Sequence, residues 1–195
     1  MRKADIARKT AETDISLSLN LDGRGKWTGD TGVGVLNHML ELLARHGRLD
    51  LEVNCKGDID VDFHHSVEDI GIVFGQALDR ALGQRRGICR FGQALIPMDE
   101  ALVQTALDIS GRAHLSWKVE MPTEKIGAFD SQLVEEFFLA LTRAAGLTLH
   151  ITCLAGRSSH HIAEGVFKSF ARALNAAVRT EAGFEDEIPS TKGVI

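Results

Sequence analysis

The feature that most constrains this chain is a pair of matching clusters of side chains that can bind metal. Adjacent histidines followed by a glutamate, in the pattern His-His-x-x-Glu, occur at His64, His65 and Glu68 and again at His160, His161 and Glu164. If each cluster begins a helix, residues three and four positions apart share a helix face, so each glutamate stands beside a histidine. Imidazole nitrogen and carboxylate oxygen together are a common ligand set for Mn, Fe, Co or Zn. Both clusters are therefore candidate metal ligands.

The spacing within each cluster also limits how a metal is bound. Adjacent residues point about 100° apart around a helix, so two neighbouring histidines cannot easily hold the same ion. We expect neighbouring histidines to serve different metals, in a site that holds two metals rather than in two separate closed sites. Neither cluster contains a cysteine, which argues against a thiolate zinc site. An isolated His-His pair is usually a surface or capping feature, and it is the duplication that favours the metal hypothesis.

Composition narrows the class of protein. The length of 195 residues is enough for one or two domains with a proper core. A formal net charge of -5 argues against a general nucleic-acid binder. Three scattered cysteines, an odd number, are typical of free thiols in a reducing compartment. The chain has no apolar run long enough to cross a bilayer and no signal-peptide core at its start, so we expect a cytoplasmic protein without a membrane partner.

Hydrophobic periodicity predicts the elements of the first half. Apolar residues alternate with polar ones in the strand patterns and recur at helical spacing in the helix patterns. The predicted elements are a strand over Thr10–Asp22, a hairpin turn over Leu21–Gly25, a helix over Gly32–Arg45, a strand over Leu49–Lys56 and a helix over Ser66–Leu82.

The second half repeats this order after a polar connector at Gly83–Gly87. Its predicted elements are strands over Cys89–Ile96, Ala101–Ile109 and Leu115–Val119, a helix over Phe129–Ala145, a strand over Leu147–Cys153 and a helix from His160 to about Thr180. The two clusters lie 160 − 64 = 96 residues apart, close to half the chain. We therefore predict an α+β fold, an internally duplicated two-layer sandwich in which each half is a small sheet with two helices on one face. The halves, about 8–86 and 87–195, are expected to share a core.

Several motifs, taken together, resemble one enzyme family. They are Leu36-Asn37-His38-Met39-Leu40, Ala44-Arg45-His46-Gly47, the stretch from Asp62 to Gly71, Arg90-Phe91-Gly92, Pro97-Met98-Asp99-Glu100-Ala101, Asp108-Ile109-Ser110-Gly111-Arg112 and the stretch from Leu154 to His161. With the Ser-Thr-Lys-Gly tail they resemble the imidazoleglycerol-phosphate dehydratases. The resemblance runs from about Arg8 to the C-terminus.

The resemblance implies a cofactor and an assembly. Manganese is expected as Mn²⁺, two ions per active site, at sites formed between the subunits of a large homo-oligomer, a 24-mer. The positions that match the family's metal ligands are His38, His64, His65, Glu68, His160, His161 and Glu164.

Glu136 departs from the family pattern. Many relatives carry a histidine at this position, which is the internal-repeat partner of His38 at a separation of 136 − 38 = 98 residues. Glutamate can still bind manganese, a hard ion that accepts oxygen. Glu136 is therefore either an eighth metal ligand or an exposed helix glutamate.

The resemblance also implies substrate contacts. The family's phosphate contacts correspond to Arg90, Arg112, Lys168, Ser190 and Lys192, with Thr191 in the same tail. Glu12 corresponds to a glutamate near the substrate and is the expected catalytic acid and base, while His46 has a supporting role. The metal ligands other than Glu136 are expected to border the substrate as well. Taken alone, the two arginines are typical of solubilising charges at strand ends.

The implied reaction converts D-erythro-imidazole-glycerol phosphate to imidazole-acetol phosphate and water, a late step of histidine biosynthesis. No carbonyl acidifies the hydrogen that is lost, so we expect a metal-stabilised imidazolate to expel the hydroxyl. A metal-dependent hydrolase of a phosphorylated small molecule could use the same ligands and is the alternative. A nucleic-acid-binding module is a third class, which the acidic charge and the duplicated ligands disfavour.

Overall fold

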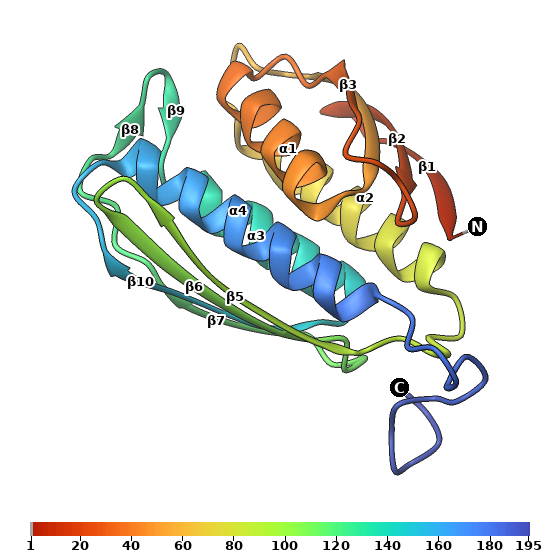
Figure 1. Ribbon diagram of the computed structural model, residues 1–195. Coiled ribbons are helices and arrows are strands. Elements are labelled where there is room, and N and C mark those ends of the chain that lie inside the picture. The colour runs from red at the N-terminus through yellow and green to blue at the C-terminus, as the bar shows by residue number, and fades with distance from the viewer. Residues whose placement is uncertain (1) are drawn as a thin grey trace.

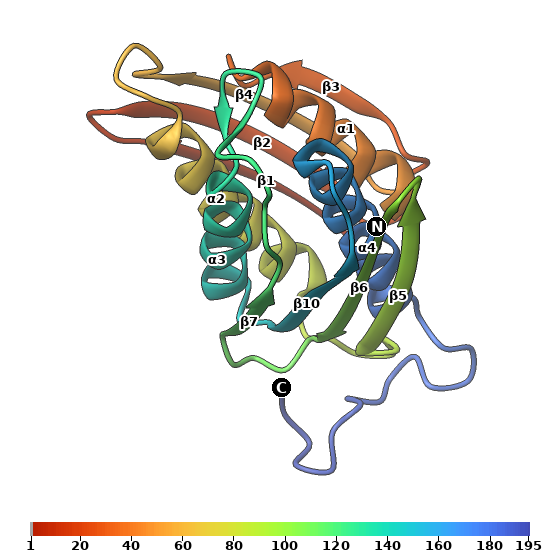
Figure 2. The same ribbon diagram turned by 90° about the vertical axis from the view of Figure 1, so that its left-hand side faces the viewer.

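Within residues 2–195, which the computed structural model describes, four long helices lie between two four-stranded sheets (Figure 1). One sheet and two of the helices come from each half of the chain. The helices of the two halves face one another, so that the sheets form the two outer layers (Figure 2).

The first half contributes one sheet and the helices α1 and α2. In chain order its elements are β1 (Lys3–Lys9), β2 (Thr13–Asn20), β3 (Trp27–Asp30), α1 (Gly34–Gly47), β4 (Asp50–Gly57) and α2 (His64–Leu82). The strand order is β1-β2-β4-β3. Ile15, Leu17 and Leu19 point inward at alternate positions of β2 and are buried, as the period of two predicts.

The second half repeats this arrangement. Its elements are β5 (Phe91–Met98), β6 (Ala101–Asp108), β7 (His114–Lys118), the short strands β8 (Lys125–Ile126) and β9 (Phe129–Asp130), α3 (Leu133–Ala145), β10 (Thr148–Ala155) and α4 (Ser159–Val178). The strand order β5-β6-β10-β7 matches that of the first sheet position by position. In both sheets the strand before the last helix pairs in parallel with an edge strand. The predicted α+β fold, with two helices on one face of each sheet, is confirmed.

The core is continuous through both halves. Helix α1 packs against α4, and α2 packs against α3. Four phenylalanines from α3 and α4 form a buried aromatic cluster with ring centroids 5.0 to 5.3 Å apart, and they are Phe137, Phe138, Phe167 and Phe170. Such aromatic pairs stabilise the fold by more than the burial of their apolar area alone would.

Helices α2 and α3 approach closely at two glycines. A Cβ atom at Gly71 would lie 2.7 Å from the backbone oxygen of Phe137, and one at Gly75 would lie 2.6 Å from that of Leu141. The absence of side chains at these positions lets the helix backbones meet.

Three details differ from the sequence-based expectation. The predicted hairpin after β2 is wrong: β3 pairs in parallel with β4, while β2 lies between β1 and β4. The strand β1 was not predicted. The third helix begins at Leu133 instead of Phe129, because Phe129–Asp130 pairs with β8 around Gly127, which adopts a positive φ.

No helix within residues 2–195 is long and apolar enough to cross a membrane.

Candidate active site

Three of the predicted metal ligands converge where α1 crosses α4. His38 Nε2 lies 3.2 Å from Glu164 Oε1, and His160 Nε2 lies 3.1 Å from the same oxygen. The two imidazole rings stack with centroids 5.9 Å apart. One ligand atom from each residue lies within 4.8 Å of the others. This is a set of donors that a transition-metal ion prefers, gathered from two helices.

Helix geometry explains the convergence. His160 and Glu164 are four residues apart on α4, so they share a face, and His38 projects from α1, which packs on that face. The Glu164 side chain is only 10% exposed, whereas the two imidazoles are 44% and 45% exposed. Burial raises the pKa of Glu164, but hydrogen bonds from Lys168, His38 and His160, with the charge of Lys168, outweigh it and hold the pKa at about 2. The carboxylate is therefore ionised at neutral pH.

The first His-His cluster begins α2, where its two histidines point in different directions. Their rings lie edge to face, with centroids 6.3 Å apart and ring planes 89° apart. His64 Nε2 lies 3.9 Å from Glu68. His65 Nδ1 lies 2.9 Å from Asp58 Oδ2, while its Nε2 lies 3.7 Å from Glu12. The hydrogen bond to Asp58 raises the pKa of His65.

The second cluster shows the same division of roles between neighbours. His161, beside His160, turns away from the α1–α4 crossing, with ring planes 82° apart. Its Nδ1 lies 2.7 Å from Glu100 Oε2, and its Nε2 lies 3.9 Å from Asp99. Hydrogen bonds from His161 and from backbone N–H groups lower the pKa of Glu100 to about 2. In each half, a carboxylate thus holds Nδ1 of the second histidine, whereas Nε2 lies 3.7 or 3.9 Å from a second carboxylate, beyond hydrogen-bond distance.

Glu136 lies in the first turn of α3 and is partly buried. Helix α3 packs on α2, the helix that carries His64 and Glu68. Among residues 2–195, however, the three do not converge as His38, His160 and Glu164 do.

The residues matched to phosphate contacts lie in two separate places. Arg90 precedes β5, where its guanidinium bonds to Asp108 at 2.8 Å and to the backbone oxygen of Pro189 in the tail. Arg112 follows β6 at the same end of the sheet, and the adjacent Gly111 lies beside the C-terminal Ile195. The tail residues Ser190, Thr191 and Lys192 therefore belong to this region, which we call the basic end.

Lys168 lies at the other end of the sheet. Its Nζ lies 2.5 Å from Glu164 and 3.2 Å from the sulfur of Met98, the last residue of β5. His46 is close enough to feel its charge: burial first, and then the charges of Lys168, Arg172 and Arg45, lower the pKa of His46. Arg172 was not among the residues expected from the sequence, because only the packing of α4 against α1 brings its charge near His46.

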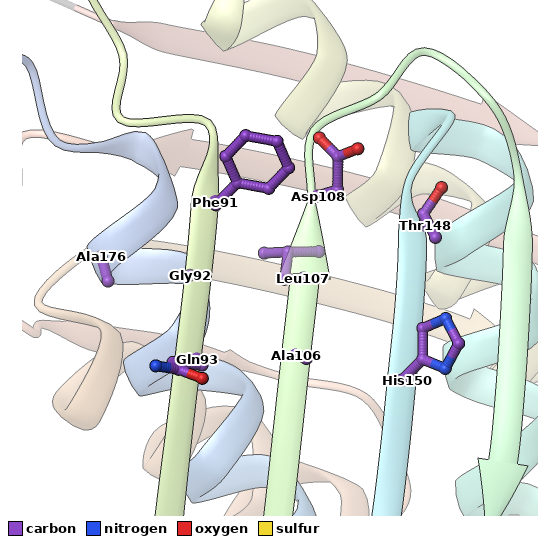
Figure 3. Close-up of a pocket in the computed structure, with 9 residues that line it drawn as sticks. All are labelled: Phe91, Gly92, Gln93, Ala106, Leu107, Asp108, Thr148, His150 and Ala176. Atoms are coloured by element: carbon purple, nitrogen blue, oxygen red, sulfur yellow. The ribbon is translucent and has the colours of Figure 1, made fainter.

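A surface groove with a volume of about 560 Å³ lies elsewhere, on the outer face of the second sheet. Figure 3 shows Phe91, Asp108, Thr148 and His150 along this groove, on three neighbouring strands. None of the predicted metal ligands lines it. The groove is therefore separate from the cluster of His38, His160 and Glu164.

Comparison with known proteins places the chain in one family. A sequence model of the imidazoleglycerol-phosphate dehydratase family matches residues 31–174. The chain is similar to imidazoleglycerol-phosphate dehydratase of Dinoroseobacter shibae, with 58% identity over 99% of both chains, and to that of Heliobacterium modesticaldum, with 53% identity over the full length of both.

Two solved structures of imidazoleglycerol-phosphate dehydratases are also similar to this chain. The crystal structure of imidazoleglycerol-phosphate dehydratase from Staphylococcus aureus is 40% identical, with a TM-score of 0.84 over 92% of this chain and 99% of that one. The Pyrococcus furiosus structure, determined in complex with (S)-C348, is 34% identical, with a TM-score of 0.84 over 97% of this chain and 100% of that one. This chain therefore belongs to the imidazoleglycerol-phosphate dehydratase family, the carbon–oxygen lyases that remove water from imidazole-glycerol phosphate in histidine biosynthesis.

Proposed function

We propose that the histidine and glutamate side chains at the starts of α2 and α4 hold the imidazole end of the substrate through two Mn²⁺ ions, and that the basic end holds its phosphate. The observation that carries this proposal is the convergence of His38, His160 and Glu164. A hydrolase would use a similar donor set, but family membership favours the lyase.

The donors present fit a divalent metal. Two imidazole nitrogens and an ionised carboxylate oxygen form an incomplete shell, which the partly exposed rings leave open to further ligands. When bound, such an ion supplies Lewis acidity that lowers the pKa of an imidazole N–H on the substrate. By the repeat, His64 and Glu68 would form the equivalent set with Glu136, since α2 packs on α3 as α1 packs on α4. His65 and His161 face away from these sets, which fits ligands offered to another subunit.

The positions of the phosphate-binding residues support a site shared between subunits. Lys168 reaches Met98 at one end of β5, and Arg90 precedes Phe91 at the other, so the strand separates them by about 7 × 3.3 Å, or 23 Å. The substrate joins its ring to its phosphate through three carbons, and bonds of about 1.5 Å cannot span that length. Arg90, Arg112, Ser190, Thr191 and Lys192 of one chain would therefore serve the ligand set of another chain. A homo-oligomer as large as a 24-mer is the assembly that we propose.

Glu12 is the proposed proton carrier. Removal of water requires a proton for the departing hydroxyl and the loss of a proton from the neighbouring carbon. A protonated Glu12 that gives its proton to the hydroxyl becomes the carboxylate that accepts the carbon-bound proton, so one residue can perform both transfers. Its side chain is 53% exposed, which leaves it accessible to a substrate. Lys168 would add positive potential beside the substrate, and His46, whose lowered pKa favours the neutral imidazole, would have a supporting role. The free cysteines fit a reducing, cytoplasmic location.

The test is an assay of metal-stripped protein with imidazole-glycerol phosphate, with and without added Mn²⁺. We expect keto product only with the metal, together with about two bound Mn²⁺ per active site by elemental analysis. Release of inorganic phosphate without keto product would instead support the hydrolase.

A further inference from the structure

The two halves of the chain place a glutamate at the same point of the repeat. Glu12 immediately precedes β2, and Glu100 immediately precedes β6, the strands that occupy the same position in the two sheets. Each glutamate lies near the second histidine of the cluster in its own half, His65 or His161. The repeat therefore gives both glutamates the same opportunity to hold a histidine.

Glu100 binds the histidine of its half directly. Its Oε2 lies 2.7 Å from His161 Nδ1, and its Oε1 accepts the backbone N–H groups of Arg157 and Ser158 at 3.1 and 2.9 Å. Both carboxylate oxygens are therefore occupied by the protein. This carboxylate fixes the imidazole and also closes the turn that precedes α4.

Glu12 does not hold His65 in this way. The place on His65 Nδ1 is taken by Asp58 Oδ2 at 2.9 Å, and Glu12 remains 3.7 Å from the opposite ring nitrogen. The backbones of the two acidic residues are linked, since the Asp58 N–H donates to the Glu12 carbonyl oxygen at 3.1 Å. On His65, Asp58 thus occupies the acceptor position that Glu100 occupies on His161. By the repeat, Glu12 would have been expected there.

The sequence shows why a second carboxylate can replace the glutamate as the histidine's partner only in the first half. Asp58 lies in the connection between β4 and α2, whereas the matching connection in the second half, Gly156-Arg157-Ser158, contains no carboxylate. Asp58 also lacks the turn-closing role of Glu100. Its second oxygen, Oδ1, is buried without a hydrogen-bond partner among the described residues. Buried polar atoms without a partner are uncommon in folded proteins.

We infer that Asp58 is a positioning residue of the dehydratase, which holds His65 through Nδ1 and so keeps the Glu12 carboxylate free for the substrate. Without Asp58, His65 Nδ1 has no acceptor, and the ring can turn so that Glu12 becomes its hydrogen-bond partner. Glu12 would then be diverted from proton transfer. This inference rests on the proposed role of Glu12 and adds to it the residue that keeps Glu12 available.

The test is a double-mutant cycle on the assembled enzyme at saturating Mn²⁺, with bound manganese counted in every sample. We expect Asp58→Ala to lower kcat about 10- to 100-fold while KM changes less than about threefold, the range for residues that orient a functional histidine. Asp58→Asn should keep kcat within about fivefold, because its amide oxygen can still accept from Nδ1–H. Asp60→Ala removes the same charge from the same loop at an exposed position and should leave kcat unchanged.

The decisive measurement is Asp58→Ala in a Glu12→Gln background. If Asp58 acts through Glu12, the second substitution should cost less than about threefold, because residues that act as a unit are not additive. A full multiplicative loss, or a loss that excess Mn²⁺ abolishes, would overturn the inference, since Asp58 would then act on the fold or on metal binding alone. Unchanged kcat in Asp58→Ala would overturn it as well.

Two further controls keep the outcomes separate. If Glu12→Gln alone retains wild-type kcat, the proposed role of Glu12 fails, and the inference about Asp58 fails with it. Asp58→Ser, whose hydroxyl is too short to reach His65, replaces Asp58→Ala if sedimentation shows that the alanine variant does not assemble.

Discussion

His38 and Glu164 are 126 residues apart in the chain, yet His38 Nε2 lies 3.2 Å from Glu164 Oε1. This contact joins the two halves of the duplicated fold at the point where α1 crosses α4. It places a donor from the first half in a ligand set that otherwise belongs to the second.

The first prediction concerns this ligand set. His38→Ala should remove roughly one equivalent of tightly bound Mn²⁺ per chain, because two donors remain where three converge. Elemental analysis after dialysis measures the loss. His114→Ala, which removes an exposed histidine from β7, is the matched control and should keep the full complement. Equal metal content in both variants would show that His38 is not a metal ligand.

The second prediction concerns Glu136. If the repeat places Glu136 with His64 and Glu68, Glu136→His should preserve the metal content, because imidazole also binds Mn²⁺, whereas Glu136→Ala should lower it. Glu135→Ala changes the exposed neighbour in the same helical turn and should have no effect. Isothermal titration of the metal-free variants gives the number of sites. Full occupancy in Glu136→Ala would identify this residue as a surface glutamate.

The third prediction concerns His46, whose pKa is lowered by burial and by the charges of Lys168, Arg172 and Arg45. An NMR titration should give a pKa below the ordinary value of 6.5. Arg172→Gln should raise it, whereas Arg143→Gln, on another helix, should not. A histidine with a lowered folded-state pKa binds its proton more weakly than in the unfolded chain. Its contribution therefore makes the free energy of unfolding decrease as the pH falls below 6.5.

The fourth prediction concerns the contact between α2 and α3. Gly75→Ala forces a methyl group to within 2.6 Å of a backbone oxygen of α3 and should destabilise the fold by about 1–3 kcal/mol. Gly34→Ala, at the start of α1, meets no atom within 4 Å and should stabilise by about 0.4–1 kcal/mol. Urea denaturation of metal-free protein compares the two. Opposite signs are expected, and a neutral Gly75→Ala would show that the helices can separate freely.

The fifth prediction tests whether the site is shared. His38→Ala and Arg90→Gln chains should each be inactive alone, but random mixing after dissociation should restore about a quarter of the sites if the two residues come from different chains. If both served the same chain's site, every site would lack one of them and mixing would restore nothing. Refolded mixtures of each variant with itself are the controls.

The sequence predicted the fold class from its periodicity, and it predicted the reaction through its resemblance to a known family. The alternation of Ile15, Leu17 and Leu19 determines which face of β2 is buried, and the helical spacing after His64 and His160 places both clusters at helix starts. These are local periodicities, which the backbone imposes whatever the rest of the chain does. The repeat followed from the same patterns.

Only the tertiary structure decided how the pieces meet. The pairing of β3 with β4 depends on contacts between strands that no turn motif specifies, so the hairpin prediction failed there. The contact of His38 with Glu164 depends on how α1 packs across α4. The choice of Asp58 over Glu12 as the partner of His65 depends on distances of a few ångströms between a loop and a helix start. Such choices are set by packing between distant segments, because the sequence states which groups are present but not which of several equivalent acceptors a given nitrogen reaches.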